Sequence, residues 1–145
     1  MKPILKHVRG RTLDELEGGA AVAGDSYLLS EIRRLRRVPL RDFRLEDLRL
    51  LIGQGIGLSY LVPIALSHLR EHPLASGHFY HGDLLKQVMT VDEVFWAGHA
   101  DLRVILVEAL ERAVPRVGKV QAPPDLEGAI KANLEQHRSA LSHAV

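Results

Sequence analysis

The chain has 145 residues and a mass of 16.1 kDa, which is enough for one domain with its own hydrophobic core. Apolar residues make up 46% and charged residues 26% of it, as in an ordinary globular protein, and the net charge of +1 argues against a partner attracted by strong charge of either sign. The chain contains no cysteine, which excludes disulfide frameworks, thiol nucleophiles and thiolate metal sites.

The beginning of the chain, Met1–Arg9, does not resemble a signal peptide, because charged residues interrupt the apolar ones at once. No apolar run approaches the roughly 18 residues that a membrane span requires. These features predict a cytoplasmic protein that makes no membrane contact.

A first short helix is predicted after Thr12. Thr12 and Glu15 have the spacing of a capping box, in which each side chain accepts the backbone N–H of the other residue. This helix is expected to continue through Leu16. The glycine-rich run at 18–24 then predicts a flexible connector.

A second helix is predicted between Asp25, as its capping residue, and Pro39, because the residue before a proline leaves the helical region. Its apolar face is expected to comprise Leu28, Ile32 and Leu35. Its other face begins a cluster of arginines that continues beyond the proline: Arg33, Arg34, Arg36, Arg37, Arg41, Arg44 and Arg49.

The arginine cluster has two interpretations. Clustered guanidinium groups neutralise phosphates, so a small helical nucleic-acid-binding protein that uses segment 33–49 is the alternative function. A solvated helix face is favoured instead, because acidic residues lie among the arginines and few aromatic rings are present to stack on bases. Nucleic acid is therefore not the expected partner.

The middle of the chain predicts two helices joined by a glycine-rich break. The first covers Leu45–Ile52, and the break at Gly53–Gly57 has three glycines in five residues, which end the helix and permit positive φ. The second is expected to begin near Ser59, with Pro63 in its first turn, and to end at His72. The helical period before the break argues against a dinucleotide-binding loop.

The segment at 72–83 predicts a surface loop. Asp83 is expected to cap the next helix, while Phe79 and Tyr80 are expected to pack the loop onto the core. Four histidines lie in or near this loop without a ligand pattern that directs them to one point: His68, His72, His78 and His81. No metal and no cofactor are predicted.

The sequence contains no recognised catalytic motif. Histidine–acid pairings such as His81 with Asp83, and His99 with Asp101, place the acid at an expected helix start, where it already has a capping role. No catalytic residue is predicted, and the chain is not expected to be an enzyme.

The second half of the chain predicts three further helical segments. Thr90–Glu93 reads as a second capping box before a turn that carries Trp96, for which a core position is favoured over that of an exposed anchor. A long helix is expected over 101–114. Asp125 is expected to cap a last helix with an inner face of Leu126, Ile130, Leu134, His137 and Leu141.

The run DLRLLIGQGIGLSYLVPIALSHL, followed by GHFYHGDLL, resembles the immunity proteins of bacterial contact-dependent growth inhibition (CDI) systems. The resemblance covers Asp47 to Leu85 and is carried by LIGQ, the proline inside an apolar helix and the closing GDLL. Proteins of that family are small, mostly helical and cytoplasmic, and they bind and block a cognate toxin domain, often a nuclease. The resemblance implies stoichiometric inhibition of the C-terminal toxin domain of a CDI effector.

Helix-period stripes account for most apolar residues, so the predicted fold is all-α, a single-domain bundle of about six helices over residues 1–145. The expected partner-binding surface comprises the loop and helix starts where polar and aromatic groups gather. Its predicted members are Tyr80, His81, Asp83, Asp92, Glu93 and Trp96.

Overall fold

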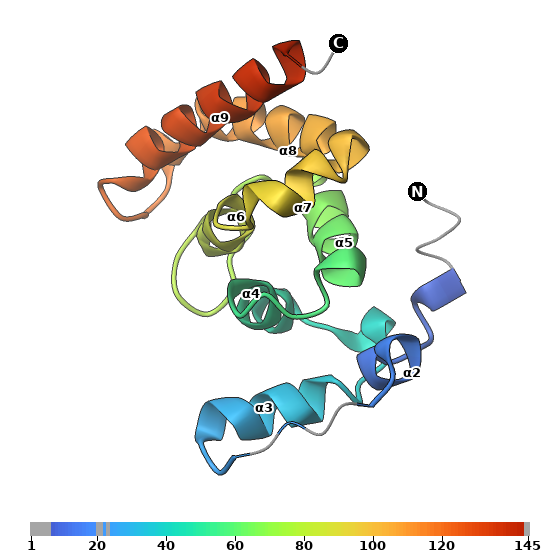
Figure 1. Ribbon diagram of the computed structural model, residues 1–145. Helices are drawn as coiled ribbons and strands as arrows, with labels where there is room; N and C mark the ends of the chain where they lie inside the picture. The colour runs from blue at the N-terminus through green and yellow to red at the C-terminus, as the bar shows by residue number, and fades with distance from the viewer. Residues whose placement is uncertain (1–6, 20–21, 23, 144–145) are drawn as a thin grey trace.

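The computed structural model describes residues 7–19, 22 and 24–143 (Figure 1). These residues form eight α-helices and two short 3-10 helices: α2 (Leu13–Glu17), α3 (Tyr27–Leu35), η1 (Leu40–Asp42), α4 (Leu45–Gly53), α5 (Leu58–Glu71), α6 (Asp83–Met89), α7 (Glu93–Ala97), α8 (Ala100–Ala113), η2 (Val117–Lys119) and α9 (Leu126–Ser142). Within the described ranges the only β-type pairing is an isolated bridge between Ser76 and His81. The predicted all-α class is confirmed, and the expected number of about six helices is close.

The helices are arranged from one end of the molecule to the other, with the middle of the chain in the centre (Figure 1). Figure 1 shows α8 and α9 side by side at one end and α2 and α3 at the other, with α4, α5 and α6 between them. Helix α5 packs against α4 and α8, and α6 packs against α4 and α9. The buried apolar side chains form one continuous cluster to which all of these helices contribute. No helix in the described part of the chain is long and apolar enough to cross a membrane.

The glycine break between α4 and α5 is needed for both conformation and space. Gly55 and Gly57 have φ of 71° and 63°, a region that side chains disfavour. A Cβ at Gly57 would lie 2.9 Å from the side chain of Leu13, so glycine also lets α2 approach closely. Because α5 begins at Leu58, Pro63 lies in its second turn. The expected position was the first turn.

The capping predictions have mixed outcomes at the N-terminal end. The capping box is confirmed, since the N–H of Glu15 donates to Thr12 Oγ1 at 3.1 Å and the N–H of Thr12 donates to Glu15 Oε1 at 3.2 Å. The prediction for Asp25 is wrong: Ser26 is the N-cap of α3, and its hydroxyl accepts the N–H of Leu29 at 3.1 Å. Residues 20–21 and 23 of the predicted connector lie outside the described residues.

The prediction of a second capping box at Thr90–Glu93 is wrong. Asp92 is the N-cap of α7 and its carboxylate accepts the N–H of Val94 at 3.2 Å. The Thr90 hydroxyl donates instead to the carbonyl of Gln87 at 2.6 Å, at the end of α6. The two long C-terminal helices lie where they were expected, within one residue at the ends of α8.

Candidate functional site

The loop between α5 and α6, residues 72–82, is held by the carboxylate of Asp83. Its Oδ1 accepts the N–H of Gly77 at 2.6 Å and its Oδ2 accepts the N–H of Phe79 at 3.0 Å. Asp83 was predicted to cap α6, but it is the first residue of that helix and Gly82, with φ of 94°, is the N-cap. The buried carboxylate therefore stabilises the loop conformation and does not cap α6.

A second carboxylate, that of Glu46 on α4, also binds the loop. Its Oε1 accepts the N–H of His78 at 3.0 Å, and its two oxygens accept from Arg49 at 2.7 and 2.6 Å. The hydrogen bonds from Arg49, with a smaller effect of the His78 N–H, keep the pKa of the Glu46 carboxyl below its ordinary value. Glu46 is thus a charged acceptor that links α4 to the loop.

Phe79 lies on the outside of this arrangement. The guanidinium carbon of Arg49 lies 4.5 Å from the centre of the Phe79 ring, a cation–π contact, and 68% of Phe79 remains exposed. The prediction that Phe79 packs onto the core is therefore wrong, because the loop turns the ring toward Arg49. Tyr80 is partly buried against the core, and this burial raises the pKa of its phenol.

The groove beside Phe79, here called the Phe79 groove, lies between the N-terminal end of α3, α4 and the loop. It has a volume of about 310 Å³. Its apolar lining comes from Tyr27, Leu28, Leu50 and Phe79. In Figure 1 the N-terminal end of α3 and the α5–α6 loop lie on the same side of α4.

Three arginine–carboxylate pairs also line the Phe79 groove. Their shortest N–O distances are 2.8 Å for Arg34–Glu31, 3.0 Å for Arg44–Asp47 and 2.6 Å for Arg49–Glu46. In the first two pairs the guanidinium group is the more exposed partner and the carboxylate is the more buried one. The rim of the groove therefore presents positive groups to solvent.

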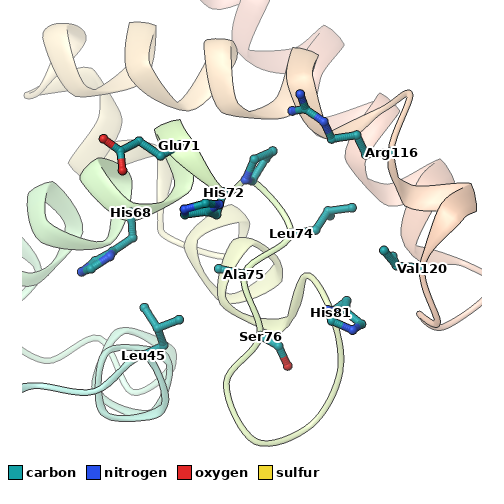
Figure 2. A pocket seen from close by; sticks show the side chains of 11 residues that line it. Leu45, His68, Glu71, His72, Leu74, Ala75, Ser76, His81, Arg116 and Val120 are labelled. Carbon is teal, nitrogen blue, oxygen red and sulfur yellow. The ribbon is translucent and has the colours of Figure 1, made fainter.

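A larger cavity of about 630 Å³ is lined by the end of α5, by other residues of the loop and by the segment after α8 (Figure 2). His68 and His72 reach it from the end of α5, His81 from the loop, and Arg116 from the segment after α8. Burial, and next the charge of Arg9, lowers the pKa of His68. Among the residues that the structure describes, no group of three or more histidines and carboxylates is arranged to hold a metal ion.

The six residues predicted to bind a partner fall in two segments of the chain, 80–83 and 92–96. Tyr80, His81 and Asp83 belong to the loop and the start of α6, and the other three belong to α7 and its cap. Asp83 is buried and its carboxylate accepts backbone N–H groups of the loop, and its contact with a partner stays a prediction. His81 is exposed.

Trp96 is a core residue and not a surface anchor. It is 1% exposed, and its indole N–H donates to the carbonyl of Val91 at 3.1 Å. Its ring also meets that of His137 edge to face. Asp92 and Glu93 are exposed beside it, and Glu93 accepts a hydrogen bond from the buried Arg103.

The arginines of segment 33–49 mostly have acceptors within the protein. Arg33 donates to the carbonyls of Val22 and Gly24 at 2.7 and 2.8 Å. Arg36 is buried and donates to Asp14 and Glu17 at 2.8 and 2.9 Å. These guanidinium groups attach α3 to α2 and the preceding segment.

Sequence reasoning missed the Phe79 groove. Leu28 was assigned to the buried stripe of its helix but is exposed, and Tyr27 was not singled out. A signal was present in Tyr27, a large aromatic residue outside the apolar stripe of its helix. Its significance depends on α3 lying close to a loop that is about fifty residues away in the chain.

A helical chain whose preformed surface is an apolar groove rimmed by guanidinium groups has the features of a protein that binds another protein. The family model for CDI immunity proteins matches residues 12–106, which is more than half of the chain and includes the whole Phe79 groove. This chain belongs to the family of CDI immunity proteins. No curated protein matches it.

Proposed function

We propose that this protein neutralises its cognate CDI toxin by forming a stoichiometric complex with the C-terminal toxin domain in the cytoplasm. The observation that supports the proposal is the family match over residues 12–106, because CDI immunity proteins neutralise CDI toxins. The toxin domain is proposed to be a nuclease, since the toxins of such systems often are. In this proposal the protein acts by binding and carries out no reaction.

The structure supports such a binding role through its rigid loop. The carboxylates of Asp83 and Glu46 fix the backbone of residues 77–79 before any partner arrives. A surface that is already ordered loses little conformational freedom on binding, which favours tight complexes. Tight inhibition depends mainly on slow dissociation, so a preformed surface suits a toxin inhibitor.

The proposal is tested by capture and rescue. The protein, tagged at its N-terminus, is recovered from its native cells at high salt, and what stays bound is identified. We expect one protein in stoichiometric amount, the toxin domain of a large effector. Expression of that domain alone should stop growth, and co-expression with this protein should restore it. Nucleic acid that elutes as salt rises, with no protein partner, would instead support the arginine-based alternative.

The exposed residues of the surface predicted from the sequence, His81, Asp92 and Glu93, remain a prediction for toxin contact. The structure sharpens the test of this surface. Replacement of Glu93 removes the partner of the buried Arg103, which changes stability as well as the surface. Asp92→Asn keeps a capping oxygen and is the cleaner variant, and unchanged toxin affinity would remove Asp92 from the contact surface.

A further inference from the structure

Exposed apolar side chains gather at the Phe79 groove. In the described part of the chain five large hydrophobic residues are exposed, and three of them, Tyr27, Leu28 and Phe79, line this one groove. The other two lie on α7 and α8. Single exposed apolar residues are ordinary on a protein surface, but a cluster at a concave site is typical of an interface.

The Phe79 ring is held in place although it is exposed. The ring lies on the guanidinium group of Arg49, which is itself fixed by two hydrogen bonds to Glu46. The backbone N–H groups of residues 78 and 79 donate to Glu46 and Asp83, respectively. A partner that covers the ring therefore gains apolar burial without paying much to order it.

The charges at the rim indicate the chemistry of the partner. Arg34 and Arg44 direct exposed guanidinium groups to solvent, while Glu31 and Asp47, their acidic partners, are more buried. A segment with carboxylates would meet these groups as it enters the groove, and its apolar side chain would meet Tyr27 and the other apolar residues. A cationic rim does not fit the phosphate-binding cleft of a nuclease, because that cleft is itself cationic.

We propose that the Phe79 groove is the toxin-binding surface, and that it takes a toxin segment in which an apolar side chain is flanked by carboxylates. This inference rests on the proposed function and adds to it the surface used and the chemistry of the partner. The apolar side chain sits between Tyr27, Leu28 and Phe79. The flanking carboxylates bind Arg34 and Arg44. The contacted toxin surface is acidic and lies outside any cationic cleft that binds phosphate.

Nucleic acid fits the groove less well than an acidic protein segment. The three arginines of the groove are each paired with a carboxylate within hydrogen-bonding distance, so its positive charge is confined to the exposed guanidinium groups of Arg34 and Arg44. A phosphate backbone repeats its charge at every nucleotide and would also meet these carboxylates. Carboxylates placed at two points of a folded toxin domain avoid this repulsion.

The first test compares matched apolar variants. Affinity for the toxin domain captured by the wild-type protein is measured for Phe79→Ala, Tyr27→Ala and the control Val104→Ala, a residue that is 44% exposed on α8. We expect Phe79→Ala to weaken binding by about 30-fold or more, as at an interface hot spot, and Tyr27→Ala by about 10-fold. The control should stay within about two-fold of the wild type. Melting curves of all three should match that of the wild type.

The second test examines charge. The double variant Arg34→Gln/Arg44→Gln should bind the toxin domain about 10-fold more weakly at low salt and show a smaller dependence of affinity on salt. Unchanged or tighter binding by this variant would show that the bound segment is not acidic. Single-stranded RNA that binds the wild type but not Phe79→Ala, while toxin binding is unaffected, would overturn the assignment to a toxin.

Failure of the groove and failure of the proposed function give different results. If the wild type neither binds a toxin domain nor restores growth, the proposed function fails. If the wild type does both, and Phe79→Ala and Tyr27→Ala bind within about two-fold of it, only the groove is wrong.

Discussion

Two regions of this protein combine an aromatic ring with an arginine–carboxylate pair, and they do so in opposite orientations. Beside Trp96, the Arg103 side chain is 6% exposed and that of Glu93 52%. At the Phe79 groove, the Arg44 side chain is 63% exposed and that of Asp47 only 7%. The first region therefore presents a carboxylate to solvent and the second a guanidinium group.

The aromatic rings follow the same division. Trp96 is buried and hydrogen-bonded, so its apolar surface already stabilises the fold. Phe79 is mostly exposed, so most of its apolar surface is still free for a partner. The comparison teaches that residue type alone does not separate a core anchor from a recognition anchor. The separation comes from which group the surrounding helices cover.

The largest expected effect is on the Trp96 side. Trp96→Ala removes a fully buried ring and leaves the Val91 carbonyl without its indole donor, so the free energy of unfolding should fall by about 3–5 kcal/mol. Denaturation by urea, followed by circular dichroism, measures this change. Trp96→Phe keeps most of the ring volume and should lose less. A loss below about 1 kcal/mol for the alanine variant would contradict a structural role.

The sequence predicts those parts of the fold that depend on long apolar periodicity. Helices α8 and α9 and the pair α4–α5 lie where their apolar stripes place them. Their buried apolar residues recur at helical spacing, with a wider stripe on α5 than on the others, and this pattern is local to each helix. The all-α class follows from the same pattern.

The roles of single polar residues were less predictable from the sequence. Asp25 and Ser26 are neighbouring residues of equal capping ability, so the sequence does not decide between them. Asp83 stands at the start of a helix, where a capping residue is expected, but it is the first residue of α6 and its carboxylate accepts N–H groups of a loop that only the folded chain brings to it. The Phe79 groove is less local still, because it joins α3 to the loop near 79.

The next largest effect is expected at the carboxylate that holds the loop. Asp83→Ala leaves the N–H groups of Gly77 and Phe79 without their acceptor, which should lower the free energy of unfolding by about 1–3 kcal/mol. Hydrogen exchange at these amides should speed up. Asp101→Ala, at an exposed position in the first turn of α8, is the control and should change stability by less than about 1 kcal/mol. Equal exchange rates in both variants would count against the role of Asp83.

A still smaller change in stability is expected at the other aromatic ring. Phe79→Ala removes a largely exposed side chain, so the free energy of unfolding should change by about 0.5 kcal/mol or less. This value is a fraction of that expected for Trp96→Ala and sharpens the contrast between the two rings. Urea denaturation under the same conditions measures it. A loss above about 2 kcal/mol would show that Phe79 supports the fold and that its effect on binding is indirect.

The last effect is one on the pH dependence of stability, and it is expected at His137, which packs edge to face on Trp96. Burial, and next the charge of Arg103, lowers the pKa of its imidazole in the folded state. Below about pH 6.5, the ordinary imidazole pKa, the unfolded chain takes up a proton that the folded chain does not. This contribution to stability is therefore complete above pH 6.5 and is lost as the pH falls toward the lower pKa of the folded state.

His137→Leu tests this dependence, because leucine has a similar volume and does not titrate, and because His137 Nδ1 has no hydrogen-bond partner in the described part of the protein. The difference in unfolding free energy between pH 7.5 and pH 5.5 should be smaller for the variant than for the wild type. The reduction should equal the free energy linked to the one proton that the unfolded wild type takes up at His137. Every other titrating group is common to both proteins and cancels. An identical pH dependence would mean that His137 is protonated equally in both states, and that the Trp96 side tolerates a charge as readily as the Phe79 groove does.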